Sequence, residues 1–390
     1  MAGSSAEVMW DVPGSFAWGV FHERHPRLIH QLGTDLPLTA EQRHALGELL
    51  DETLTGTVRP LPADAPDAGR WAAWGAGRYG RPWGETSFLW AESYFYRRLL
   101  GALGYFDQGT WHGLDPFGPA KAAELHGGAV DAELAGLDDL PESAPGSAGG
   151  RALGDALLTA SLWGNRADLG FRITAGRGSG PDGPLLADGR EAIWKHLAAR
   201  PGRVCLVADN AGPELLPDLV LVDHLLHTGL AEAVVLHVKP HPYYVSDATP
   251  ADTYACLRRL RSASGAAAEV GERLWREVES GCLVVRAHPF SCAPLGYADM
   301  PDDLRRDFAA ATLTVMKGDL NYRRLVGDRH WPATRPFADA VAHFPGPVAA
   351  LRTLKSDVAV GLDAATEARL DADEPGWRTS GRHALIQARL

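Results

Sequence analysis

The stretch from Val204 to Asp218, V-C-L-V-A-D-N-A-G-P-E-L-L-P-D, constrains the fold more than any other part of the chain. Its apolar opening, which ends at Ala208, is typical of a strand buried on both faces. After the polar pair Asp209 and Asn210, apolar residues recur at the spacing of an amphipathic helix, at Leu215, Leu219, Val222 and Leu226. In open α/β sheets, ligands bind just beyond the carboxyl ends of such strands, beside helix N-termini. This stretch therefore predicts both an α/β fold and a polar site.

Apolar runs of strand length alternate with helical segments through the C-terminal part of the chain. They cover residues 204–208, 233–238, 282–285, 313–316 and 358–360. Strand–helix alternation favours a mostly parallel sheet with helices on both faces. We therefore predict a three-layer α/β/α, doubly wound domain over residues 151–390.

The N-terminal part shows helical periodicity instead. Helical spacing of apolar residues is clear within 15–60 and again in the aromatic-rich segment 90–103, and few convincing strands precede residue 150. The run L-P-E-S-A-P-G-S-A-G-G at 140–150 suits a linker or a long surface loop. We predict an all-helical subdomain over residues 1–145, packed on the α/β/α domain.

Composition limits the classes of partner. The chain of 390 residues has a formal net charge of −11, which argues against a broad nucleic-acid-binding surface. Its four cysteines form no C-x-x-C pair, as expected of reduced thiols in the cytoplasm. No apolar run approaches the length that spans a bilayer, and the N-terminus lacks the order of a signal peptide. We expect a cytoplasmic protein without nucleic-acid or membrane partners; the sequence does not indicate its oligomeric state.

Polar residues follow three of the predicted strands. They are Asp209 with Asn210, the segment from His237 to Asp247, and a group from Lys317 to Arg323 that includes Asp319 and Asn321. Carboxylate and amide oxygens are the ligands that Mg²⁺ or Mn²⁺ prefers, and lysine or arginine beside such an ion suits a phosphate. If the three strand ends share one edge of the sheet, these residues indicate phosphoryl chemistry.

Each of these elements has a structural alternative. Asp209 and Asn210 are about as suited to capping the following helix as to binding a metal. The Lys317–Asp319 segment suits a turn, with Gly318 adopting an unusual backbone angle. A zinc site at His237 and His241 is disfavoured, because the prolines beside His241 exclude a helix and no cysteine is placed to help.

Eight sequence blocks, taken together, resemble the damage-control phosphatase family, specifically its acidic-residue-methyltransferase-like branch. They follow the order of the family and extend over nearly the whole chain. The blocks are S-F-A at 15–17, W-A-E-S-Y-F-Y-R-R at 90–98, D-P-F at 115–117, S-L-W-G-N-R-A-D-L at 161–169, D-N-A-G-P-E-L-L-P-D at 209–218, H-V-K-P-H-P-Y-Y-V-S-D at 237–247, K-G-D-L-N-Y-R-R-L at 317–325 and R-T-L-K-S-D at 352–357.

The resemblance implies a divalent-metal-dependent phosphatase of sugar phosphates or other phosphorylated metabolites. It implies Mn²⁺ or Mg²⁺ as the metal, with Co²⁺ or Ni²⁺ as further candidates, held by Asp209, Asn210 and Asp247, the residues that the strand-end argument selects. It also implies that Lys317 contacts the phosphate, so that Asp209, Asp247 and Lys317 are the expected catalytic residues. The expected substrate-binding residues are Glu92, Arg97, Asn165, Asp168, His241, Lys317, Asp319, Asn321 and Arg323. For Glu92, Arg97, Asn165 and Asp168, helix capping and salt bridges between the subdomains are the alternative.

Two rival functions stay open. One is carboxyl methyl transfer from S-adenosylmethionine, although no glycine-rich G-x-G turn follows the 204–208 strand. The other is a non-catalytic binding protein that retains the fold, against which the intact metal positions argue. For hydrolysis the attacking group is either water or a carboxylate, and we favour water.

Overall fold

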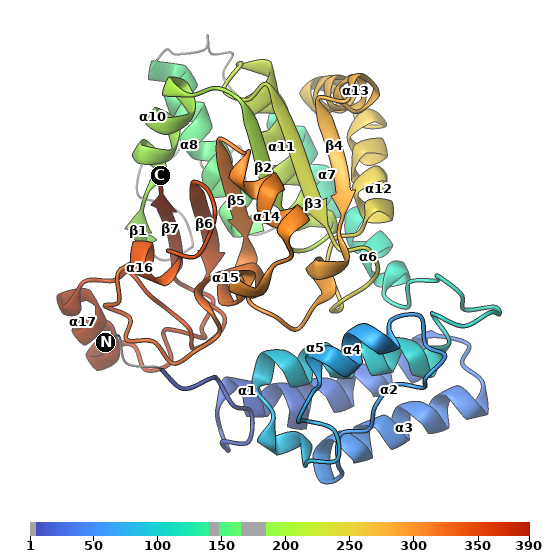
Figure 1. The fold of residues 1–390 in the computed structure, drawn as a ribbon. Helices are drawn as coiled ribbons and strands as arrows, with labels where there is room; N and C mark the ends of the chain where they lie inside the picture. Colours follow the sequence, from blue (N-terminus) through green and yellow to red (C-terminus); the bar gives the residue numbers. More distant parts are fainter. Residues whose placement is uncertain (1–4, 140–147, 165–184) are drawn as a thin grey trace.

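The computed structural model describes residues 5–139, 148–164 and 185–390, and its C-terminal part is an α/β domain as predicted (Figure 1). Within the described residues the sheet has seven strands in the order β1-β7-β6-β5-β2-β3-β4. Every neighbouring pair is parallel except β6 and β7. The strands are β1 Leu185–Asp188, β2 Arg203–Val207, β3 Ala233–Val238, β4 Leu283–Ala287, β5 Leu313–Lys317, β6 Val348–Thr353 and β7 Ala384–Arg389.

Helices cover both faces of this sheet, which gives the predicted three layers (Figure 1). One face carries α8 Ala148–Trp163, α10 Arg190–Ala199, α11 Leu215–His227, α12 Pro250–Arg261 and α13 Gly265–Ser280. The other carries α14 Asp302–Ala309, α15 Gly318–Val326 and α16 Phe337–Ala340. Residues of β2 alternate between the two cores: Leu206 packs in the α11 core and Val207 in the other. Strands buried on both faces in this way are continuous apolar runs, which is why β2 was readable from sequence.

The remaining helical elements lie mainly in the N-terminal part and in the connections. They are α1 Phe16–Gly19, η1 Val20–Arg24, α2 His25–Asp35, α3 Ala40–Thr55, α4 Ala68–Trp74, η2 Trp83–Glu85, α5 Phe88–Leu103, α6 Gly118–Leu125, α7 Gly128–Ala135, η3 Gly136–Asp139, η5 Gly212–Glu214, η6 Pro289–Cys292, η7 Tyr297–Asp299 and α17 Ala364–Asp373. None of the helices in the described residues is long and apolar enough to cross a bilayer.

The N-terminal helices pack in two places. Helices α1 to α5 lie together below the sheet domain, and α5 is buried along almost its whole length (Figure 1). The apolar side chains of α6 and α7, such as Leu125 and Val130, instead join the core around α11. A boundary between two domains near residue 145 stays a proposal, because α6 and α7 pack against the α/β domain although they precede the 140–150 stretch.

The strand predicted at 358–360 was wrong, and the strand lies earlier, at β6. Val358, Ala359 and Val360 are almost fully buried, so their apolar character reflects burial and not strand pairing. Side chains supply the hydrogen bonds that a neighbouring strand would otherwise make. Arg352 donates to the Val358 carbonyl, and Gln387 Nε2 donates to the Val360 carbonyl at 2.7 Å. A buried backbone needs hydrogen-bond partners, but they need not come from a neighbouring strand.

Candidate active site at the carboxyl ends of β2, β3 and β5

The predicted metal ligands lie where the winding of the sheet reverses. Strand β2 pairs with β5 on one side and with β3 on the other, and all three are parallel. Their carboxyl ends therefore share one edge of the sheet, and the loops that leave them run side by side. Such a switch point is where doubly wound proteins bind ligands.

Asp209 lies directly against the start of α15. Val207 pairs with Met316, so the same register carried two residues further sets Asp209 opposite Gly318. Gly318 has a φ of +81°, and a Cβ built on it would lie 1.8 Å from Asp209 Oδ2. Only glycine fits this position, because any side chain would collide with the carboxylate.

Asn210 and Asp247 are held beside Asp209 by main-chain hydrogen bonds. The two residues form an isolated antiparallel bridge, in which Ala211 N–H donates to the Ser246 carbonyl at 2.7 Å. Ala248 N–H donates to the Asp209 carbonyl at 2.9 Å. The Asp247 carboxylate is oriented by Tyr244 N–H, 2.7 Å from Oδ2. All three predicted metal ligands thus lie on two loops that are hydrogen-bonded to each other.

The charge distribution around Asp209 fits a bound dication. Burial raises the pKa of Asp209 to about 8, and repulsion from Glu214 and Asp247 adds to this, while Lys355 and Lys239 oppose it. The Asp209 carboxylate accepts no hydrogen bond from any described residue. A divalent ion would relieve the repulsion between these carboxylates, and two carboxylates with one amide oxygen are hard ligands suited to Mn²⁺ or Mg²⁺. Among the described residues, no group of three or more His, Cys, Asp or Glu side chains is arranged to hold a metal, so water or substrate would complete the coordination.

The Lys317 side chain forms hydrogen bonds on the face of the sheet that α8 and α11 cover. Its ammonium donates to Asp218 Oδ1 at 2.7 Å and to the Ser161 carbonyl. Asp218 lies on α11 and Ser161 on α8, and the Lys317 side chain is almost fully buried. The structure therefore places this ammonium in a buried ion pair with Asp218. Its predicted contact with a phosphate stays a prediction.

Two lysines that were not predicted as site residues, Lys239 and Lys355, lower the pKa of Asp209. Lys239 is buried, with its ammonium 5.8 Å from the centre of the Tyr243 ring. Lys355 is exposed to solvent and makes no hydrogen bond or ion pair with another described residue. Lys355 could have been predicted from its position in the R-T-L-K-S-D block, which begins at the end of β6. Glu214, in the D-N-A-G-P-E block, was missed in the same way.

Asn321 and Asp319, two of the expected substrate-binding residues, have structural partners. Asn321 Nδ2 donates to the carbonyls of Ala208 at 3.0 Å and Lys317 at 2.8 Å, which ties the end of β2 to the end of β5. Asp319 accepts from Arg352 Nε at 2.8 Å. These side chains hold the loops in place around Asp209.

Arg323 forms a bidentate ion pair with Asp328, at 2.7 and 2.9 Å. Its Nη1 also lies 3.7 Å from Glu92 Oε2 on α5, so this pair joins the helical part to the α/β domain. Burial raises the pKa of Glu92, and Arg323 opposes that shift. Glu92 and Arg323 therefore form a salt bridge between α5 and α15, the kind of contact that was the alternative to substrate binding for Glu92.

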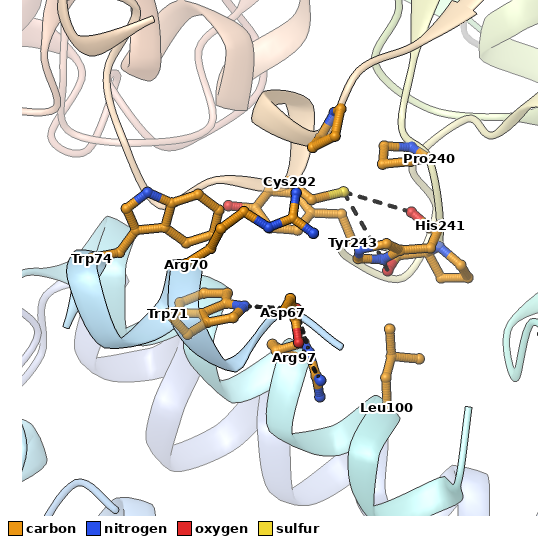
Figure 2. Close-up of a pocket in the computed structure, with 12 residues that line it drawn as sticks. Asp67, Arg70, Trp71, Trp74, Arg97, Leu100, Pro240, His241, Tyr243 and Cys292 are labelled. Atoms are coloured by element: carbon orange, nitrogen blue, oxygen red, sulfur yellow. Dashed lines mark hydrogen bonds and ion pairs between the residues drawn. The ribbon is translucent and has the colours of Figure 1, made fainter. Parts of the chain in front are cut away.

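Arg97 and His241 lie at a small cavity between the helical part and the loop after β3. Figure 2 shows Arg97 paired with Asp67 below His241, and the two nitrogens of Arg97 lie 2.8 and 2.6 Å from the Asp67 oxygens. The cavity measures about 110 Å³, and Trp71, Trp74 and Tyr243 are among the residues that line it. This volume suits only a small part of a ligand.

A pair of stacked tyrosines lies on the loop between this cavity and Asp247. Tyr243 lines the cavity, and Tyr244 stacks on it with ring centres 4.8 Å apart. Tyr244 is the residue whose N–H donates to Asp247. His241, Arg97 and Tyr243 thus line the same cavity, and Tyr244 follows Tyr243 on the loop that leads to Asp247. Asn165 and Asp168 lie outside the described residues.

A family model for the damage-control phosphatase ARMT1-like domain matches residues 20–370 of the chain. The chain belongs to this family. It is 31% identical over 395 residues to damage-control phosphatase ARMT1 of Danio rerio, covering 93% of this chain and 83% of that protein. It is also 31% identical to damage-control phosphatase ARMT1 of Xenopus tropicalis, covering 78% of this chain and 75% of that protein.

A solved structure supports the fold of this family member. A crystal structure of a DUF89 family protein from Pyrococcus horikoshii matches with a TM-score of 0.50 and 13% sequence identity, covering 88% of this chain and 91% of that one. At this identity the match shows the fold alone. The predicted family and α/β fold class are both confirmed.

Proposed function

We propose that this member of the family is a divalent-metal-dependent phosphomonoesterase acting on sugar phosphates or related phosphorylated metabolites. The observation that supports the proposal is the convergence of Asp209, Asn210 and Asp247 on two hydrogen-bonded loops at the switch point of the sheet. Family membership supports phosphate-ester hydrolysis as the reaction.

In this proposal Asp209, Asn210 and Asp247 hold Mn²⁺ or Mg²⁺, with Co²⁺ or Ni²⁺ as substitutes. The ion supplies positive charge for the phosphoryl oxygens, whose charge must be neutralised as the ester bond breaks. Tyr244 N–H fixes the orientation of Asp247, and the hydrogen bonds of Asn321 fix the strand ends on which Asp209 depends. The protein thus supplies a preorganised set of oxygen ligands.

Lys355 and Lys317 differ in whether their ammonium groups are already paired with another side chain. Lys355 is exposed and unpaired among the described residues, so its ammonium is available to a phosphoryl oxygen. Lys317 must share its Asp218 contact with the substrate if it is to touch the ester. We propose Lys355 as the phosphate-binding lysine open to solvent, with Lys317 contributing positive charge from its buried pair. His241 is retained as a specificity residue for the part of the substrate remote from the phosphate.

Phosphate release from p-nitrophenyl phosphate and from a panel of sugar phosphates tests the proposal. We expect activity that EDTA removes and Mn²⁺ restores. Asp247→Asn keeps the shape of the side chain but removes a charged ligand, and should lower kcat/KM about 100-fold or more. Asp302→Asn, on the exposed start of α14, is the control and should change nothing. Activity indifferent to EDTA, or an unaltered Asp247→Asn enzyme, would overturn the proposal.

Calorimetry with S-adenosylmethionine addresses the rival reaction. In the structure β2 leads into the D-N-A-G turn and then η5, without a glycine-rich turn that would receive a dinucleotide-like cofactor. We therefore expect no binding. Binding of S-adenosylmethionine without phosphatase activity would favour methyl transfer, and inertness in both assays would favour a binding protein.

A further inference from the structure

Arg24 ends a five-residue π-helical turn, η1, inserted between α1 and α2. Such turns are rare inside helices and occur often at functional sites. The next residue, His25, anchors the turn: it is fully buried, and its ring stacks on Phe95 with centres 3.7 Å apart and planes 2° apart. The position of Arg24 is therefore fixed by the packing of its neighbour.

Arg24 is a cation among acidic groups, but it is paired with none of them. Its pKa is raised first by Tyr96 and then, against the opposing effect of burial, by Glu92, Tyr244 and Asp247. Its guanidinium nevertheless makes no hydrogen bond or ion pair with any described residue, and the residue keeps part of its surface open to solvent. An unpaired guanidinium near a proposed metal ligand is available to a ligand.

The Tyr96 hydroxyl is a second group without a partner close to Arg24, because the Tyr96 ring lies 5.6 Å from that of His25, the next residue. Tyr96 is fully buried, and its hydroxyl has no hydrogen-bond partner among the described residues. Its ring lies 4.9 Å from that of Tyr244, the residue that orients Asp247. Buried hydroxyl groups are normally hydrogen-bonded, and an exception calls for an explanation such as a ligand.

We propose that Arg24 and the Tyr96 hydroxyl form a phosphate-binding subsite that the helical part of the chain contributes to the Asp209–Asp247 site. The inference rests on the proposed phosphatase function, whose substrate would be held between the two parts of the molecule. Planar guanidinium groups bind phosphate through two parallel hydrogen bonds, which suits Arg24 better than a lysine. Glu92 forms no ion pair with Arg24, because its Oε2 instead lies 3.7 Å from Nη1 of Arg323.

Inorganic phosphate is the probe, because its binding is measurable without turnover. We expect calorimetry in the presence of Mn²⁺ to show that Arg24→Ala weakens phosphate binding about 10- to 100-fold, the usual value of a charge-assisted hydrogen bond. Mn²⁺ affinity should be unchanged, and Tyr96→Phe should weaken phosphate binding about 3- to 10-fold, as for a neutral hydrogen bond.

Arg27→Ala is the matched control. Arg27 lies three residues further on, is exposed, and pairs with Glu23 at 3.2 Å, so its removal should leave phosphate binding as in the wild type. Arg24→Lys keeps the charge and should bind phosphate with intermediate affinity, with a raised KM for p-nitrophenyl phosphate and a nearly unchanged kcat. If Arg24→Ala does not fold, this conservative variant decides the question.

The outcomes separate this inference from the proposed function. Phosphate binding that depends on Arg24, in a protein that hydrolyses no ester, would support the subsite and overturn the phosphatase. Hydrolysis with phosphate affinity equal in the wild type, Arg24→Ala and Arg24→Lys would overturn the subsite and keep the phosphatase. A lowered Tm in Arg24→Ala with unaltered phosphate affinity would give Arg24 a structural role, and a wild type that binds no phosphate would also reject the subsite.

Discussion

Asp209 and Gly318 meet across the carboxyl ends of two neighbouring parallel strands, so closely that a Cβ on Gly318 would lie 1.8 Å from Asp209 Oδ2. The first residue of α15 must therefore be glycine for a reason outside its own helix. This relationship ties the K-G-D block to the D-N-A-G block, which the sequence shows only as two separate motifs.

Gly318→Ala should displace the Asp209 carboxylate and lower Mn²⁺ affinity and kcat/KM about 100-fold, because one charged ligand is lost. The matched control is Gly327→Ala at the other end of α15. Gly327 also has positive φ, +97°, but no atom would lie within 4 Å of its Cβ. Both variants carry backbone strain, so both should be less stable, but only Gly318→Ala should lose the metal. Equal Mn²⁺ affinity in calorimetry would contradict a ligand role for Asp209.

The sequence predicted the three proposed metal residues because each follows an apolar run, and parallel strands bring such ends together. It could not show the partner of Lys317. Strand alternation decides which face of the sheet a terminal residue meets, and Met316 and Lys317 lie on opposite faces. Asp218 is a charged residue within the apolar helix α11, and a buried charge of this kind needs a partner.

Strands β1 and β7, at one edge of the sheet, were not predicted from the sequence for a different reason. Strand β1 has four residues, and its partner β7 lies nearly two hundred residues later in the chain. Strand β7 is antiparallel to β6, so it breaks the strand–helix alternation on which the prediction depended. Pairings this distant depend on tertiary packing, which a local pattern does not record.

Lys355 is expected to be the exposed phosphate ligand. Lys355→Ala should lower kcat/KM about 10- to 100-fold, because a charge-assisted hydrogen bond to the phosphoryl group is lost. Lys195→Ala, a similarly exposed lysine on α10, is the control and should have no effect. Steady-state kinetics with p-nitrophenyl phosphate and Mn²⁺ distinguish the two. Wild-type kinetics in Lys355→Ala would leave Lys317 as the candidate.

The Asp218–Lys317 ion pair should be a structural requirement. Asp218→Asn leaves a buried ammonium without its counter-charge, and we expect it to lower the free energy of unfolding by about 3–5 kcal/mol. The double variant Asp218→Leu with Lys317→Met removes both charges and should recover most of this loss. Urea unfolding measures both. If the double variant is stable but inactive, Lys317 is also needed for catalysis; if Asp218→Asn is as stable as the wild type, the pair is not important for folding.

Buried His237 should make the fold sensitive to acid. Burial lowers its pKa to about 4, helped by Arg286 and His288 and opposed by Asp307, and its Nε2 has no partner among the described residues. Below pH 6.5 the unfolded chain binds a proton at this position that the folded chain does not bind, so stability falls as the pH is lowered toward 4. One such group is worth about 2 kcal/mol between pH 7.5 and 5.0. His237→Phe, next to Phe308, should reduce the acid loss in urea unfolding by that amount, whereas His44→Gln at the surface should not. An unchanged pH dependence in His237→Phe would show that His237 binds its proton equally well in the folded and unfolded chains.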